Sequence, residues 1–202
     1  MLSGDAILTL SIFLLSLSVH EYAHGWVAYR CGDDTAARMG RLTLNPIAHI
    51  SLVGTIVMPL VVGFGWAKPV PVNFAVLNKR QIFLVAAAGP ASNLLLVVAS
   101  TISFHILRPG MTPFLARLIS LAVLYNLILA VFNLIPIPPL DGSKMVYASL
   151  RSPQAIAAYK YFAQFGIFIL MGLLWFGGLE RIVLPVVARL YVLLELPLPF
   201  GR

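Results

Sequence analysis

The stretch His20-Glu21-Tyr22-Ala23-His24 lies inside an apolar run, and these two properties together decide the fold. Residues four positions apart share one face of a helix, so the two imidazoles can bind one metal ion. A carboxylate directly after the first histidine is typical of hydrolytic zinc sites. Because residues 8–19 and 26–29 are also apolar, we expect the metal site inside a membrane helix.

Composition supports a membrane protein. The chain has 202 residues, of which 60% are hydrophobic and only 10% are charged, whereas soluble domains have about 25% charged residues. Since one crossing takes about 20 apolar residues, we expect an all-α polytopic membrane protein with about four to six transmembrane helices. We expect a single integral-membrane domain over residues 1–202, with its core at about 6–145 and C-terminal helices at 146–202. The net charge of +7 is scattered over loops, which favours membrane topology over a nucleic-acid partner.

The apolar runs predict transmembrane helices at residues 6–29, 81–107, 114–135 and 161–178. Residues 50–64 contain two glycines and a proline and predict a short or re-entrant element. The X-Pro steps in residues 66–73 favour extended backbone, which we interpret as the edge strand of a small membrane-associated β-hairpin. The tail at 179–202 predicts either a last span or a helix in the membrane interface.

A catalytic zinc site normally has three protein ligands and one open position. Among the seven acidic residues, only Glu21 and Asp141 lie within apolar stretches that reach the membrane. Inserting a charged side chain at the bilayer centre costs roughly 2.5–3.5 kcal/mol of free energy. Metal ligation or catalysis would explain why Glu21 and Asp141 are there. If residues 50–64 are re-entrant, Asp141 leaves the membrane on the same side as Arg30. Most of the lysines and arginines would lie on that side, which the positive-inside rule makes cytoplasmic.

Three motifs resemble those of the site-2 proteases, which are intramembrane zinc metalloproteases. They are His20-Glu21-x-x-His24, Gly89-Pro90-x-x-Asn93, and Asn133 followed by Leu140-Asp141-Gly142, and the resemblance covers about residues 16–145. The resemblance implies one Zn²⁺ held by His20, His24 and Asp141, with Glu21 as the general base and Asn133 near the substrate or oxyanion. The stretch from Trp66 to Asn73 looks like that of the compact prokaryotic members, and we expect no room for a PDZ or CBS domain.

The resemblance also implies that the substrates are transmembrane segments of other proteins, cut near the cytoplasmic side of a prokaryotic inner or plasma membrane. A helical substrate must unwind before its peptide bond is attacked, and an edge strand would offer replacement hydrogen bonds. We therefore predict that Trp66, Val70 and Val72 bind the substrate. Asn93, a candidate to line the polar cavity that admits water, is also expected among the substrate-binding residues. The expected partners are these transmembrane segments and the lipid bilayer, and we expect no nucleic-acid partner. The sequence leaves open whether the protein forms a homo-oligomer.

Several alternatives stay open at this point. Asn93 and Asn133 have a competing use in hydrogen bonds between membrane helices, and Asp141 has one as a helix cap. The whole chain could be a catalytically silent zinc-binding scaffold, although such a protein would be expected to lose Glu21. Broken helices also suit an ion-coupled transporter, but the sequence has no internal symmetry.

Overall fold

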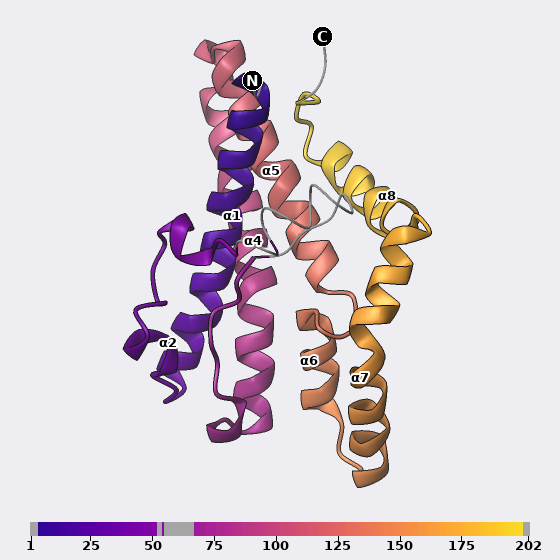
Figure 1. Ribbon diagram of the computed structural model, residues 1–202. Helices are drawn as coiled ribbons and strands as arrows, with labels where there is room; N and C mark the ends of the chain where they lie inside the picture. Colours follow the sequence, from indigo (N-terminus) through magenta and orange to yellow (C-terminus); the bar gives the residue numbers. More distant parts are fainter. Residues whose placement is uncertain (1–3, 52–53, 55–66, 200–202) are drawn as a thin grey trace.

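The computed structural model describes residues 4–51, 54 and 67–199 (Figure 1), and the described chain is helical without any β-strand. Four long helices dominate it: α1 (Gly4–Arg30), α4 (Lys79–Leu107), α5 (Pro113–Asn133) and α7 (Pro153–Trp175). The shorter elements are α2 (Thr35–Arg38), η1 (Pro46–His49), η3 (Phe74–Val76), η4 (Arg108–Gly110), α6 (Asp141–Ser149) and α8 (Gly178–Leu193). The all-helical class is as predicted.

Within the residues that the structure describes, four helices are long and apolar enough to cross a membrane, at Asp5–Arg30, Lys79–Gly110, Pro113–Asn133 and Pro153–Trp175. The predicted start of the last span at residue 161 is wrong. Ser152 caps α7 by accepting a hydrogen bond from the Ala155 N–H, and Pro153 occupies the first turn, where its missing N–H costs nothing. Lys160 is tolerated within the helix because it is exposed.

Helices α1, α4 and α5 run side by side, with α4 in contact with both of the others (Figure 1). A capping box of Asn78 and Gln81 begins α4, and the short turn at η4 sends the chain back along it as α5. Helix α8 packs its buried residues Val183, Val187 and Tyr191 into the same apolar core as α5. These three residues are four apart, so the tail forms an amphipathic helix rather than one apolar on all sides.

The predicted edge strand over residues 66–73 is wrong in its described part, which is irregular at residues 67–73. Pro69 and Pro71 have no N–H to give to a ladder. The backbone N–H groups of Lys68, Val70 and Asn73 donate hydrogen bonds to His49, Glu21 and Asp33, and none of these acceptors lies in a neighbouring strand. The predicted hairpin therefore has no support in the described chain. Trp66 and nearly all of the predicted re-entrant element at 50–64 lie outside the described residues.

A proline-rich connection brings α6 back toward α1. Three prolines between residues 136 and 139 prevent a continuous helix after α5. At the start of α6, a Cβ on Gly142 would lie 2.3 Å from the Leu134 carbonyl oxygen, so only glycine permits this close approach. The turn is thus tight enough to place Asp141, the first residue of α6, beside α1.

Candidate metal centre

Two histidines from α1 and one aspartate from α6 converge in the interior of the protein. His20 Nε2 lies 3.1 Å and His24 Nε2 lies 3.0 Å from the same oxygen, Asp141 Oδ2. The two Nε2 atoms are 3.0 Å apart. All three residues are buried, and together they form a group that could hold a metal ion. The structure therefore brings together the three ligands that the sequence predicts, across 121 positions of chain between His20 and Asp141.

The outer hydrogen bond of His24 fixes which ring nitrogen faces the cluster. Its Nδ1 lies 2.7 Å from the Val85 carbonyl oxygen of α4. A carbonyl can only accept, so Nδ1 carries the proton and Nε2 presents a lone pair to the cluster. Metal-binding histidines are usually oriented by a bond of this kind.

A chain of buried amides does the same for His20. Asn126 Nδ2 donates to the Ala122 carbonyl at 2.8 Å and to Ser16 Oγ at 2.9 Å. This leaves Asn126 Oδ1 to accept from Asn93 Nδ2 at 2.7 Å, and Asn93 Oδ1 then lies 2.6 Å from His20 Nδ1. Because the Ala122 carbonyl can only accept, it fixes the direction of every hydrogen bond in this series of amides. The proton of His20 therefore lies on Nδ1.

These outer bonds make the cluster fit a metal ion. With both Nδ1 atoms protonated, the two Nε2 atoms direct lone pairs at each other and at the Asp141 oxygen, and a cation between the three atoms would satisfy them together. Two imidazole nitrogens and one carboxylate oxygen are a donor set of catalytic zinc sites, where a fourth position stays open. Gly89 of α4 leaves room for this group, because a Cβ there would lie 2.4 Å from His24 Nε2 and 2.5 Å from His20 Nε2.

The second oxygen of Asp141 has a partner of its own. Lys144 Nζ, one turn further along α6, donates to Asp141 Oδ1 at 2.9 Å. The positive charge of the Lys144 ammonium favours the ionised form of the Asp141 carboxyl. The side chain is thus a carboxylate with Oδ2 available to a metal.

The predicted site residues other than the three metal ligands lie outside the cluster of His20, His24 and Asp141. Glu21 is half-buried, and its Oε2 accepts a hydrogen bond from the Val70 N–H at 2.8 Å. Asn133 lies at the end of α5, where its Nδ2 donates to the Leu129 carbonyl of its own helix at 3.0 Å. Val72 is half-buried and packs against the apolar cluster around Ala28 of α1. The predicted roles in catalysis and substrate binding stay predictions, including that of Trp66, which lies outside the described residues.

Three residues at this centre were not singled out as site residues by the sequence. Asn126 is an isolated amide in an apolar helix, which is the signal that could have found it. Lys144 follows Asp141 by three positions, the spacing of neighbours on a helix face. Gly89 lies within the Gly-Pro motif, but only the packing of α1 on α4 shows that it touches the imidazoles.

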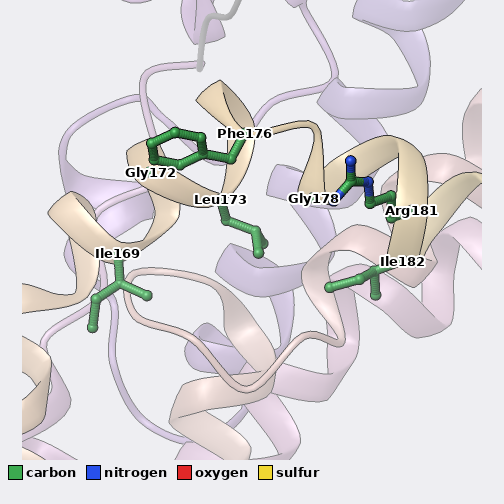
Figure 2. Close-up of a pocket in the computed structure, with 7 residues that line it drawn as sticks. All are labelled: Ile169, Gly172, Leu173, Phe176, Gly178, Arg181 and Ile182. Carbon is green, nitrogen blue, oxygen red and sulfur yellow. The ribbon is translucent and has the colours of Figure 1, made fainter.

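A separate hollow lies at the turn between α7 and α8 (Figure 2). It has a volume of about 430 Å³ and is lined by Ile169, Gly172, Leu173, Phe176, Gly178, Arg181 and Ile182. Its lining is almost wholly apolar and holds none of the predicted site residues. The hollow and the buried cluster are thus formed by different residues.

Comparison with known proteins agrees with this centre. Residues 104–173 match peptidase family M50. "Putative zinc metalloprotease YwhC" of Bacillus subtilis is 45% identical over 143 residues, which cover 66% of this chain and 64% of the relative. "Putative zinc metalloprotease Rip2" of Mycolicibacterium smegmatis is 32% identical over 186 residues, covering 88% of this chain and 70% of the relative. "Putative zinc metalloprotease MJ0611" of Methanocaldococcus jannaschii is 27% identical over 139 residues, with coverages of 67% and 72%.

No solved structure matches the chain. The chain spans slightly less than two thirds of the Bacillus subtilis relative. The relatives are named as zinc metalloproteases, and the cluster of His20, His24 and Asp141 has the donors for that metal, so Zn²⁺ is the indicated cofactor. With its buried metal-ligand cluster and four helices of membrane-spanning length, the chain is an integral membrane protein that belongs to peptidase family M50, the site-2 protease family of zinc metalloproteases.

Proposed function

We propose that the protein is an intramembrane zinc metalloprotease that hydrolyses peptide bonds in or near the transmembrane helices of other membrane proteins. One observation carries this proposal: three metal-ligand donors converge in the interior of a bundle whose helices are long and apolar enough to span a membrane. Glu21, next to one ligand on α1, adds the carboxylate that hydrolysis requires. Peptide bonds of membrane-embedded segments are the substrates that such a position would reach.

The residues have distinct roles in this proposal. His20, His24 and Asp141 would hold Zn²⁺, which lowers the pKa of a bound water and polarises the scissile carbonyl. Glu21 takes the proton of the attacking water and passes it to the nitrogen of the leaving amide. Asn93 acts through its hydrogen bond to His20 and orients that ligand. Asn133 stays a candidate for contact with the substrate or oxyanion.

We also propose an orientation for the protein. The C-terminal end of α1, the start of α4 and the turn between α6 and α7 lie at the same end of the bundle (Figure 1). Arg30, Lys79 and Arg151 lie at these positions. The positive-inside rule supports a cytoplasmic location for this end, in the inner or plasma membrane of a prokaryotic cell.

Replacing Glu21 tests the proposal. Glu21→Gln should keep the zinc content of the wild type, because the three ligands are untouched, and should abolish release of membrane-protein fragments. The measurement is comparative proteomics of soluble fragments from cells that express each form, together with metal analysis of the purified proteins. Glu180→Gln is the matched control, because Glu180 is an exposed glutamate at the start of α8. Equal fragments from wild type and Glu21→Gln would contradict the mechanism and favour a zinc-binding scaffold.

A further inference from the structure

A single backbone amide of the irregular segment at residues 68–73 contacts Glu21. Between Pro69 and Pro71, only Val70 has an N–H to donate. This N–H donates to Glu21 Oε2 at 2.8 Å. The sequence Pro-Val-Pro thus isolates one hydrogen-bond donor, and the fold directs it at the proposed general base.

The Val70 side chain is seated on α1 as well. It is buried, with only 7% of its surface exposed. It fills the space that Gly25 leaves open, because a Cβ on Gly25 would lie 2.9 Å from Val70 Cγ1. Gly25 follows the metal-ligand residue His24 directly. Val70 is therefore fixed to the metal-binding helix by its backbone and by its side chain.

Two charged residues from the connection after α1 hold the two ends of the segment. Arg41 Nη2 donates to the Lys68 carbonyl at 3.0 Å and to the Pro69 carbonyl at 3.3 Å. At the other end, Asp33 Oδ2 accepts from the Asn73 N–H at 2.7 Å.

Both charges are buried, with 9% of Arg41 and 3% of Asp33 exposed. Neither forms an ion pair with another described residue. Buried charges are costly unless hydrogen bonds compensate them. The Lys68 and Pro69 carbonyls compensate the charge of Arg41. The Asn73 N–H compensates the charge of Asp33 together with the backbone N–H and hydroxyl of Thr35, so the two charges and the segment fix each other.

We propose that Arg41 and Asp33 are positioning residues for Glu21, acting through the backbone of residues 68–73. This inference rests on the proposed function, in which Glu21 is the general base. A base must keep one lone pair aimed at the water, and the Val70 N–H holds Oε2 so that Oε1 stays available. A misplacement of about 1 Å in such a group can lower the rate by roughly 100-fold.

Hydrogen–deuterium exchange of the purified full chain tests, without any substrate, whether Arg41 and Asp33 hold residues 68–73 in place. In Arg41→Gln, the amides of Lys68 and Val70 should exchange at least tenfold faster than in the wild type, because the two carbonyls lose their donor. In Asp33→Asn, exchange at Asn73 should rise. Arg38→Gln is the matched control, since this arginine of the same connection is 78% exposed and pairs with Asp34. It should leave the exchange at residues 68–73 unchanged.

Cleavage kinetics test the effect on Glu21. The substrate is a fluorogenic peptide that contains the transmembrane segment of a protein whose fragment is released by wild type and not by Glu21→Gln. Arg41→Gln should lower kcat by about 10- to 100-fold, with KM and zinc content unchanged. Arg41→Lys, which keeps one charged donor, should recover part of kcat.

The two inferences fail in different ways. A wild-type protein that cleaves no membrane segment would overturn the proposed function. Wild-type cleavage combined with unchanged exchange in Arg41→Gln, or with unchanged kcat in that variant, would overturn the positioning role alone. Unchanged zinc content and the Arg41→Lys variant exclude a simple failure to fold.

Discussion

Gly89 offers a sharp test of the metal centre, because a single methyl group would enter it. The Cβ of Gly89→Ala would lie 2.4 Å from His24 Nε2 and 2.5 Å from His20 Nε2, whereas an ordinary contact begins at 3.4 Å. Each nitrogen must therefore withdraw by about 1 Å, several times the tolerance of about 0.2 Å for metal–ligand distances. Alanine is also a better helix former than glycine by about 0.8–1.0 kcal/mol, so α4 itself should not be weakened.

We expect Gly89→Ala to fold and to bind zinc more than roughly 100-fold more weakly than the wild type, which exceeds the usual effect of losing one outer hydrogen bond to a ligand. Competition with a chromophoric chelator measures the affinity, and thermal unfolding of the metal-free protein measures the fold. Gly172→Ala in α7 is the matched control, because nothing lies within 4 Å of a Cβ there. Wild-type zinc affinity in Gly89→Ala would refute the assignment of this cluster as the metal site.

Three further perturbations address the surroundings of the cluster. Lys144→Met removes the ammonium that holds Asp141 Oδ1 and should weaken zinc binding by roughly 10- to 100-fold in the same chelator competition. Lys160→Met is the control and should leave the zinc affinity unchanged, because Lys160 is exposed. Asn126→Leu leaves the Asn93 amide and Ser16 hydroxyl without their buried partner, so thermal or denaturant unfolding should report a loss of about 1–3 kcal/mol; unchanged stability would contradict the amide chain. Burial raises the pKa of Asp33, but hydrogen bonds from Thr35 and the Asn73 N–H lower it below its ordinary value of 3.8. Asp33 therefore stabilises the fold at pH values above its unfolded pKa of about 3.8, and this contribution is lost as the pH falls through the lower pKa of the folded state. The Tm of Asp33→Asn should consequently decrease less on acidification than the Tm of the wild type. An unchanged acid profile in Asp33→Asn would argue against these hydrogen bonds.

The failure of the edge-strand prediction shows where local patterns stop being informative. The alternation of prolines and valines at residues 69–72 correctly indicates a non-helical backbone. It cannot indicate where the isolated Val70 N–H is directed, because its acceptor lies on Glu21, 49 positions earlier in the chain. The same holds for Asp33 and Arg41, which look like ordinary loop charges in the sequence and are buried against the segment in the structure.

The resemblance to the site-2 proteases supplied Asp141 as the third metal ligand. The sequence by itself determined the membrane class, the approximate positions of the long helices and the pair of histidines in the metal cluster. These features are local, since the length of an apolar run predicts a span and the spacing of His20 and His24 puts both on one helix face. Only the tertiary structure decided which ring nitrogens face the metal, how closely Gly89 approaches them and what holds Glu21. Each of these depends on contacts between α1 and segments more than 40 positions away, which no local pattern of side chains encodes.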